Sequence, residues 1–477
     1  MAERAEPLYL SGAAAAAAGA ALVGAPEARV ETVAADSRKA GPGALFVALP
    51  GERVDGHDYI VAALEAGASA VLARADRRGQ VLSAAGGLAA SRGAALLFAP
   101  DTLAALQSLA RDYRRRFPRL LRIGITGSSG KTTTKECAAA IIGRSRSVAV
   151  NEGNLNSDIG LPLSMFSLAA GHEVGIFEMG MNRKGEMAEL ASVYEPDIAL
   201  ITNVGTAHIG ILGSRDKIAE EKKSVFSKFD GRQVGFVWED DDYRAFLEEG
   251  VRGVMLEFGP RSTRGFRGAR ALGLEGYEID WEGLRFRFPL AGRHNLLDGI
   301  AAAALAARVG VPAGDIVEGL GSARPLFGRS EIIRGELTLV RDCYNANPDS
   351  MAAALALCDD LEWPGRRIYV LGSMLELGPE SEAEHRAAGV RAGASKAEAL
   401  FFFGEEARPA FEAAREGGFK GLMVFETDID RLRASLRSFS RPGDLVLLKA
   451  SRGMALWRAA EGLPGIPAGA DAHGHAG

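Results

Sequence analysis

The sequence has few cysteines and no long hydrophobic run. Its 477 residues include three cysteines, Cys137, Cys343 and Cys358, which are odd in number and far apart. They therefore form neither a disulfide framework nor a zinc-binding pattern, which suits a reducing compartment. No apolar stretch approaches the length needed to span a bilayer. We expect a cytoplasmic protein with no membrane segment.

The sequence also lacks an excess of basic charge. Its formal net charge is -5, and the short run Arg114-Arg115-Arg116 indicates a solvated helix end rather than a nucleic-acid surface. The remaining composition is ordinary for a globular protein, with 47% hydrophobic and 25% charged residues. We expect no nucleic-acid partner, and the length predicts two to four domains.

Glycine and serine cluster in one string, Gly124-Ile125-Thr126-Gly127-Ser128-Ser129-Gly130-Lys131-Thr132-Thr133-Thr134. Residues 120–123 before it predict a buried strand, and residues 135–142 after it predict a helix. The glycines let backbone N–H groups face one centre, and a helix N-terminus adds partial positive charge.

This string predicts an ATP site. Lys131 would reach the β- and γ-phosphates, and the Thr132 hydroxyl would bind Mg²⁺. Only two serines separate the two glycines, where the general phosphate-binding pattern has four residues. The alternative is a plain Gly/Ser turn before a lysine, but strand, turn, Lys-Thr and helix all fall in register.

Two later apolar runs, residues 173–178 and 197–204, predict parallel strands that are buried on both faces. Ligands bind beyond the carboxyl ends of such strands. Glu178 ends the first run and His208 follows the second, so both are candidate Mg²⁺ partners, although histidine is a less usual ligand for this ion. Lys222 lies in a charged helical segment, which by itself indicates only a solvated helix face.

The first 95 residues predict a small α/β unit. Residues 11–25 predict a small helix and residues 44–49 predict a strand. Ser37 and Arg38 precede a Gly-Pro-Gly turn, where an arginine fork could bind a diphosphate or a uracil edge. A capped turn with a surface arginine fits the spacing equally well.

The last third predicts another mostly parallel, Rossmann-like sheet. Strand-like runs at residues 337–340, 367–371, 400–403 and 445–448 alternate with helices that begin near residues 350, 381, 407 and 428. Before it, residues 277–280 and 284–288 predict a β-hairpin, and an Ala-rich helix follows from residue 292 to 307. Residues 462–477 predict a disordered tail.

Several strings, taken together and in order, resemble the Mur ligase family over roughly residues 8–458. They are Asp36-Ser37-Arg38, Asp55-Gly56-His57, Thr126 to Thr132, Gly153-Asn154-Leu155-Asn156, Ile159-Gly160-Leu161-Pro162, Glu178-Met179-Gly180-Met181-Asn182, Asn203 to His208, Gly292-Arg293-His294-Asn295, Tyr344-Asn345-Ala346-Asn347-Pro348-Asp349-Ser350-Met351, Leu371 to Gly378, and His385. The Tyr344 string is most similar to that of the members that join D-alanyl-D-alanine to UDP-N-acetylmuramoyl-tripeptide.

The resemblance implies an α/β fold of three domains. They would be a small N-terminal UDP-binding domain (1–95), a central P-loop ATPase-type domain with a mostly parallel sheet (96–324), and a C-terminal Rossmann-like domain (325–461). It implies ATP as the energy source, an acyl-phosphate intermediate, two Mg²⁺ ions and a role in peptidoglycan precursor synthesis. We expect a monomer.

The resemblance also implies roles for single residues. Lys131 would hold phosphate, Thr132 and Glu178 one Mg²⁺, and His208 and an N-carboxylated Lys222 the second. The expected nucleotide contacts are Gly127, Ser128, Ser129, Gly130, Lys131, Thr132, Thr133, Asn295, Arg329 and Asp342. The expected substrate contacts are Ser37, Arg38, Asn154, Tyr344, Asn345 and Asn347.

Three positions depart from the family pattern, and two rival functions remain. Ser157 and Asp298 stand where asparagine is usual, and Ser373 replaces a common aspartate. One rival is another ligase of the same fold, which adds the third peptide residue or polyglutamylates folate. The other is a non-catalytic, nucleotide-gated binding module. The third residue of the tripeptide is not legible in the sequence.

Overall fold

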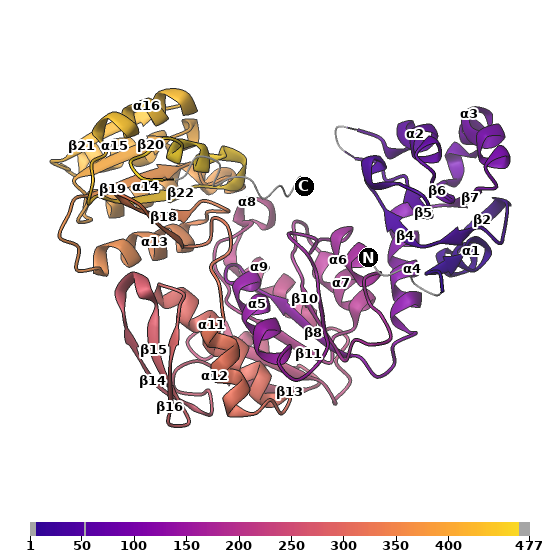
Figure 1. The fold of residues 1–477 in the computed structure, drawn as a ribbon, viewed down its shortest axis with the longest axis horizontal. Coiled ribbons are helices and arrows are strands. Elements are labelled where there is room, and N and C mark those ends of the chain that lie inside the picture. The colour runs from indigo at the N-terminus through magenta and orange to yellow at the C-terminus, as the bar shows by residue number, and fades with distance from the viewer. Residues whose placement is uncertain (1–5, 52–53, 467–477) are drawn as a thin grey trace. The chain divides into compact units, whose positions relative to one another are not determined.

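The computed structural model describes residues 6–51 and 54–466, which form two compact units. Unit 1 takes Met1–Gly124, Ser147–Met181 and Glu186–Pro196, and unit 2 takes Ile125–Arg146, Asn182–Gly185 and Asp197–Gly477. Figure 1 shows the elements of both units in chain order by colour. Of the predicted tail, residues 467–477 lie outside the described range.

Unit 1 begins with a five-stranded sheet in the order β2-β7-β6-β5-β4. Its strands β4 to β7 run parallel, and β2 is antiparallel to β7. Side chains of β5, β6 and β7 are buried against helices α2 and α3, and α1 packs on α4. The bounds are β2 Ala21–Gly24, β4 Thr32–Ala34, β5 Ala44–Val47, β6 Ala70–Arg74, β7 Ala95–Ala99, α1 Ser11–Ala18, α2 Ile60–Glu65, α3 Arg78–Ser91 and α4 Thr102–Arg114.

The helix predicted over residues 11–25 is shorter in the structure. It ends at Ala18 because Gly19 takes a left-handed conformation with φ 62° and caps it. The chain then enters β2, so the second half of the prediction was wrong. The strand predicted at residues 44–49 is confirmed as β5.

A six-stranded sheet follows, in the order β13-β12-β11-β8-β10-β9. In unit 1, β9 and β10 are parallel; in unit 2, β11, β12 and β13 are parallel. The predicted strands at residues 120–123, 173–178 and 197–204 correspond to β8, β10 and β11. The bounds are β8 Leu121–Thr126, β9 Val148–Val150, β10 Val174–Glu178, β11 Ile198–Ile201, β12 Val234–Trp238 and β13 Val254–Phe258.

Helices of unit 2 accompany this sheet, and a small antiparallel sheet follows. The helices are α5 Lys131–Ile142, α8 Ile209–Leu212, α9 Arg215–Lys223, α10 Arg244–Glu248, α11 Arg293–Arg308 and α12 Ala313–Gly321. In unit 1, α6 Gly160–Met165 and α7 Glu186–Tyr194 follow β9 and β10. The predicted hairpin is confirmed as β15 Tyr277–Trp281 and β16 Leu284–Phe288, and a third strand, β14 Phe266–Ala271, pairs with β15.

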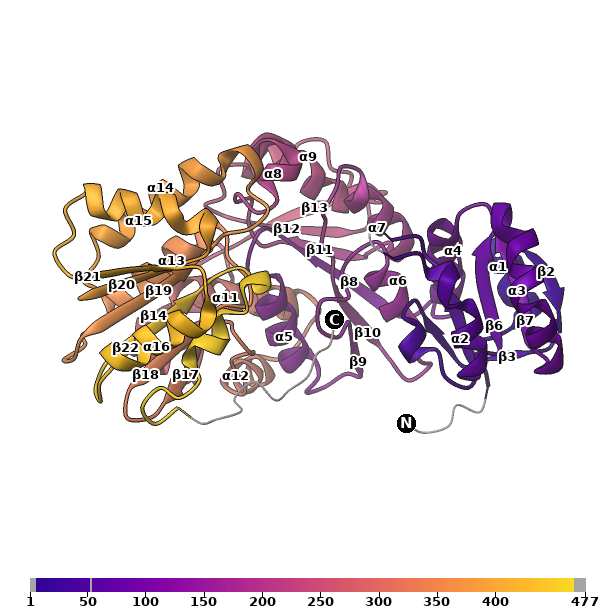
Figure 2. The ribbon, with the colours of Figure 1, turned by 90° about the horizontal axis from the view of Figure 1, so that it is seen from above.

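The C-terminal sheet of unit 2 has the order β17-β18-β22-β19-β20-β21, with only β17 antiparallel. Helices α13, α14 and α15 cover one face, and α16 covers the other (Figure 2). The bounds are β17 Glu331–Arg334, β18 Thr338–Asp342, β19 Arg367–Gly372, β20 Ala399–Phe403, β21 Leu422–Glu426, β22 Leu445–Lys449, α13 Pro348–Asp360, α14 Ser381–Gly393, α15 Arg408–Glu416 and α16 Ile429–Phe439.

The four predicted strands and four predicted helices of this region are confirmed. The sequence missed the two edge strands, β17 and β21, whose residues are only partly buried and therefore carry a weak hydrophobic pattern. Leu463 and Ile466, which the sequence assigned to a tail, are buried in the core of this sheet. Among the described residues, no helix is long and apolar enough to cross a membrane.

Candidate active site

The Gly/Ser string forms a tight turn between β8 and α5 in unit 2. Gly127 has φ 151° and Gly130 has φ 78°. A Cβ atom on Gly127 would overlap the Thr202 hydroxyl, and one on Gly130 would overlap the Asp298 carboxyl. Both positions therefore require glycine, for space and for backbone conformation.

The turn is held by the residues that follow β11. Ser128 N donates to Asn203 O at 3.0 Å, and Ser129 N donates to Asn203 Oδ1 at 3.1 Å. The Thr202 hydroxyl donates to Ser129 O at 2.5 Å, and Gly205 N donates to Ser128 Oγ at 2.8 Å. The turn is consequently pre-shaped by its own protein contacts, which is the arrangement that backbone phosphate binding needs.

Lys131 begins α5, and its ammonium folds over the turn. Its Nζ donates to Gly127 O at 2.9 Å, and Thr132 next to it is buried. Lys131 thus lies at the helix N-terminus, where its charge adds to that of the helix dipole. The predicted strand, turn and helix are confirmed, although α5 starts four residues before the helix predicted from residue 135.

Lys222 is buried near the end of α9, with a side chain only 1% exposed. The prediction of a solvated helix face, which the bare pattern favoured, is therefore wrong at this residue. Burial and the neighbouring Lys131 charge hold the pKa of the Lys222 amine well below its usual value, while Glu221 and Asp241 act in the opposite direction. A low pKa leaves a fraction of neutral, nucleophilic amine at neutral pH.

His208 precedes α8 and has a positive φ of 65°. Its Nδ1 lies 3.1 Å from Glu376 Oε2, close enough for an ion pair but outside hydrogen-bond direction. Gly210 N donates to Glu376 O at 3.2 Å, and Thr206 N donates to Asp349 Oδ2 at 2.9 Å. Within unit 2, the segment after β11 therefore contacts α13 and the loop that follows β19.

Asn295 and Asp298 lie on one buried face of α11. Asn295 Nδ2 donates to Ala291 O at 2.6 Å. The Asp298 carboxyl faces Gly130 of the turn. Burial raises the pKa of Asp298 well above its usual value, and contact with Thr134 acts in the opposite direction. The departure from asparagine at position 298 therefore touches the phosphate turn itself.

Arg329, Asp342 and Tyr344 come together at the carboxyl edge of the C-terminal sheet. The Arg329 guanidinium lies 4.0 Å from the centre of the Tyr344 ring, a cation–π distance. Asp342 Oδ1 accepts from Ser330 N at 2.9 Å, and Asp342 Oδ2 is 2.8 Å from Lys449 Nζ. Lys449 is buried and was missed by the sequence analysis; a lysine ending an apolar strand at this edge was the available signal.

The loop from Cys343 to Asn347 joins β18 to α13. Asn345 is exposed at its tip, while Asn347 caps α13, its side chain accepting from Ser350 N at 2.8 Å. The Asn347 side-chain oxygen is therefore already engaged in holding the loop.

In unit 1, Glu178 ends β10 and is held by two asparagines. Asn156 Nδ2 donates to Glu178 Oε1 at 2.6 Å, and Asn151 Oδ1 accepts from Glu178 N at 2.9 Å. Asn154 is exposed. Ser157, the departure from asparagine, accepts from Gly160 N through Oγ at 3.2 Å, at the start of α6.

Ser37 and Arg38 form a short 3₁₀ turn in unit 1. Asp36 caps the turn by accepting from Arg38 N at 3.0 Å. The exposed Arg38 guanidinium folds back on the same carboxylate, with Nη2 to Oδ2 at 2.7 Å. The structure is therefore consistent with both interpretations of this turn. It is a capped turn with a surface arginine, and the exposed arginine could also contact a ligand.

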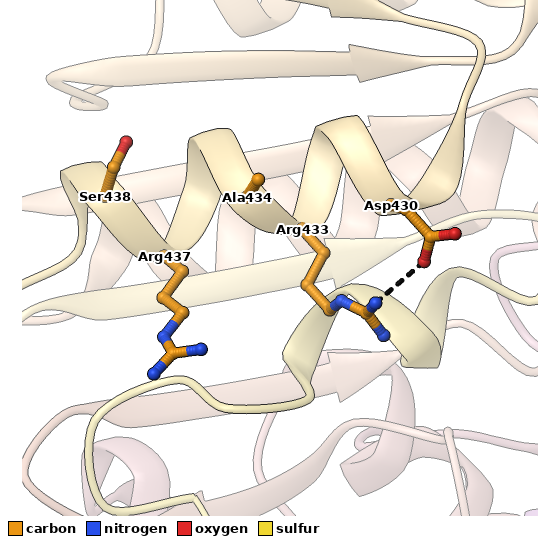
Figure 3. A pocket seen from close by; sticks show the side chains of 5 residues that line it. All are labelled: Asp430, Arg433, Ala434, Arg437 and Ser438. Atoms are coloured by element: carbon orange, nitrogen blue, oxygen red, sulfur yellow. Dashed lines mark hydrogen bonds and ion pairs between the residues drawn. The ribbon is translucent and has the colours of Figure 1, made fainter.

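Among the described residues, no group of three or more His, Cys, Asp or Glu side chains is placed to hold a metal ion. A shallow groove runs along α16 and is lined by Asp430, Arg433, Ala434, Arg437 and Ser438 (Figure 3). Arg433 pairs there with Asp430 at 2.8 Å, and no residue of the predicted site lines this groove.

Known proteins match this chain over most of its length. The Mur ligase middle domain matches residues 125–306, the Mur ligase glutamate ligase domain residues 328–452, and the Mur ligase family catalytic domain residues 29–114. The chain is 45% identical over 439 residues to the UDP-N-acetylmuramoyl-tripeptide–D-alanyl-D-alanine ligase of Treponema pallidum, across 89% of this chain and 92% of the relative. The chain belongs to the Mur ligase family.

Solved structures of Mur ligases agree with this assignment. MurF from Acinetobacter baumannii superposes with a TM-score of 0.83 at 28% identity, across 94% of this chain and 97% of that protein. MurF from Thermotoga maritima, solved in complex with ADP, superposes with a TM-score of 0.75 at 27% identity, across 90% and 96%. The predicted fold class, α/β with N-terminal, central and C-terminal Mur ligase domains, is confirmed.

Proposed function

We propose that this Mur ligase joins D-alanyl-D-alanine to UDP-N-acetylmuramoyl-tripeptide, with conversion of ATP to ADP and phosphate, in peptidoglycan precursor synthesis. The observation that carries the proposal is the 45% identity, over 89% of the chain, to a relative with that name. The turn between β8 and α5 also supports it. Gly127 and Gly130 have no space for a side chain, and such a turn lets backbone N–H groups bind a phosphate. The rival functions, another ligase of this fold or a non-catalytic module, are not favoured by these relatives.

The reaction begins with activation of a carboxylate. A peptide carboxylate resists attack by an amine because oxide is a poor leaving group. An oxygen of this carboxylate attacks the γ-phosphorus of ATP, the bond to the β-phosphate oxygen breaks, and an acyl phosphate and ADP form. The dipeptide amine then attacks the acyl carbon, loses a proton, and phosphate leaves. Phosphoryl transfer requires positioning and neutralisation of charge, which the turn and Lys131 would supply.

We assign nucleotide contacts to the turn residues 127–133, to Asn295 on the adenine side, and to Arg329 and Asp342 near the phosphate and ribose. Tyr344, Asn345 and Asn347 would face the dipeptide, and Ser37, Arg38 and Asn154 the UDP-linked substrate. The domain limits predicted from the sequence, at residues 95, 324 and 461, belong to this proposal. We also infer a monomer, and a cytoplasmic location that suits the three free, buried cysteines.

We also assign two Mg²⁺ ions to this chain. Thr132 and Glu178 offer the hard oxygen donors that Mg²⁺ prefers, and His208 with a carboxylated Lys222 would hold the second ion. Bound there, Mg²⁺ would neutralise charge on the transferred phosphoryl group. The low pKa of Lys222 favours carboxylation, because only the neutral amine adds CO₂, releasing a proton and forming a carbamate.

The proposal is tested by phosphate release from the purified protein. ATP and Mg²⁺ are held constant, and each amine is paired with the acid that its ligase would use: D-alanyl-D-alanine with UDP-N-acetylmuramoyl-tripeptide, diaminopimelate or lysine with the UDP-N-acetylmuramoyl-dipeptide that lacks the third residue, and glutamate with folate. We expect phosphate release only when the amine is D-alanyl-D-alanine. Release with diaminopimelate, lysine or glutamate instead would indicate another ligase of this fold, and no release with any amine would indicate a binding module.

A further inference from the structure

Lys449 lies at the carboxyl end of β22 and is buried, with a side chain 3% exposed. Its ammonium contacts two oxygens. One is Asp342 Oδ2, at 2.8 Å, from the end of the neighbouring strand β18. The other is the backbone oxygen of Asn345, at 2.9 Å, in the loop that follows β18. One cation therefore joins a strand-end carboxylate to the adjoining loop.

The contacts continue from Asp342 to the N-terminal end of α11. The second carboxylate oxygen, Oδ1, accepts from Ser330 N at 2.9 Å. The Ser330 hydroxyl lies 3.1 Å from His294 Nε2. Burial lowers the pKa of His294, so its ring is neutral at physiological pH and can share a hydrogen bond with this hydroxyl. His294 directly precedes Asn295 on α11.

A second set of contacts supports the same loop from the chain after β22. The Ser451 hydroxyl lies 3.2 Å from Ala346 O and accepts from Leu375 N at 2.9 Å. The loop is thus fixed through its backbone oxygens, while the exposed Asn345 side chain accepts from the adjoining Ala346 N through Oδ1, at 2.9 Å. A compact ammonium with three donors suits this task, since it can bond a carboxylate and a carbonyl at once.

We propose that Lys449 is a positioning residue that couples the nucleotide contact Asp342 to the loop that receives the dipeptide. This inference rests on the proposed function for the identity of the two ligands. Lys449 touches neither ligand itself: it sets the orientation of Asp342 and the path of the backbone at Asn345. Loss of Lys449 should therefore weaken both ATP and dipeptide binding, although its side chain is in the protein interior.

The other end of the same strand offers a matched control. Asp444, just before β22, is buried and pairs with Arg366 through two bonds of 2.9 and 2.7 Å. Arg366 also donates to a backbone oxygen, that of Phe439, at 2.9 Å. Arg366→Met thus removes a cation with the same kind of partners at the opposite edge of the sheet.

The test compares Lys449→Met with Arg366→Met in the full chain. Both variants should lose thermal stability, because each leaves a carboxylate without its cation. We expect Lys449→Met to raise the KM for D-alanyl-D-alanine on the order of tenfold, as expected for lost positioning of a binding loop. Hydrogen exchange at residues 345–347, measured without substrate, should accelerate in Lys449→Met and stay as in the wild type in Arg366→Met.

The inference would be overturned if Lys449→Met kept the wild-type KM for D-alanyl-D-alanine and the wild-type hydrogen exchange at residues 345–347. It would also be overturned if both variants changed these two quantities equally. If Lys449→Met does not fold, the double variant Asp342→Asn/Lys449→Met leaves no unpaired charge, and the same rise in dipeptide KM and in exchange is expected of it. A wild-type protein that releases no phosphate with D-alanyl-D-alanine would refute the proposed function alone. The exchange comparison, which needs no substrate, would still decide the role of Lys449.

Discussion

The turn Gly127–Lys131 in unit 2 and the turn Asp36–Lys39 in unit 1 are both proposed to contact phosphate-bearing ligands, yet they are built differently. The first is fixed by its backbone: hydrogen bonds from Ser128 and Ser129 to Asn203 hold it. The second has one local cap, and its Arg38 side chain is 74% exposed and pairs with the capping Asp36.

This difference explains why the first turn can be recognised as a binding site in the sequence and the second cannot. Backbone N–H recognition requires glycine where side chains would collide, so the glycines themselves mark the site. Recognition by an exposed side chain leaves the same pattern as an ordinary capped turn. The comparison predicts that substitutions around the first turn act through buried contacts and so also change stability, whereas substitutions in the second act on one ligand.

The largest effect is expected for Lys222→Ala, beside the first turn. Removing the group proposed to carry a carbamate should lower kcat by about 100- to 1000-fold, by analogy with loss of a stabilising group in other active sites. Added short carboxylates such as formate should restore part of the activity. Lys223→Ala is the control, because the ammonium of that partly buried neighbour donates to Phe246 O, at 2.6 Å. Unchanged turnover in Lys222→Ala would remove this residue from the mechanism.

Glycine-to-alanine changes compare the two turns directly. Gly130→Ala should lower the free energy of unfolding by about 1–3 kcal/mol through backbone strain, and it should weaken ATP binding because the new methyl group displaces the Asp298 carboxyl. Gly41→Ala, next to the second turn, meets no atom within 4 Å and should change neither. Denaturant unfolding measures the free energy of unfolding of both variants, and calorimetric titration measures their ATP binding. Equal changes in the two variants would contradict the comparison.

Arg38→Ala should act on one substrate only. We expect the KM for UDP-N-acetylmuramoyl-tripeptide to rise about tenfold, the scale of a lost hydrogen bond to a charged group, with the KM for ATP unchanged. The melting temperature should not move, because the Arg38–Asp36 pair is exposed. Arg29→Ala removes a similar exposed pair, with Glu31 at 3.0 Å, and serves as the control. A capped turn without a ligand role would give the same KM in both variants.

The smallest effect concerns the pH dependence of stability. Burial raises the folded-state pKa of Asp298 above its unfolded value, so the folded chain binds more protons and stability falls as pH rises from the unfolded pKa to the folded one. Asp298→Asn removes this ionisation. The variant should therefore melt higher than the wild type at neutral pH, with a difference that shrinks as pH falls toward 4. Parallel melting curves across pH would contradict a protonated Asp298.

The sequence predicted most elements because buried parallel strands have continuous apolar runs, as in β10, β20 and β22. It predicted the phosphate turn because the glycines and Lys-Thr lie in one string. It could not show that Lys222 is buried, because a charged helix with one lysine facing inward has the same sequence pattern as a fully solvated one. Lys449 and Asp241 were missed because their partners lie far away in the chain. For the same reason no role was predicted for Glu376, which lies beside His208 in the structure.

The central claim is that a carboxyl group is activated as an acyl phosphate and then passed to D-alanyl-D-alanine. It is tested most directly with UDP-N-acetylmuramoyl-tripeptide that carries ¹⁸O in the reacting carboxylate, by mass analysis of the released phosphate. We predict one ¹⁸O atom in each phosphate, because the carboxylate oxygen bonded to phosphorus leaves with it. Phosphate without ¹⁸O, released while the peptide product forms, would contradict the account.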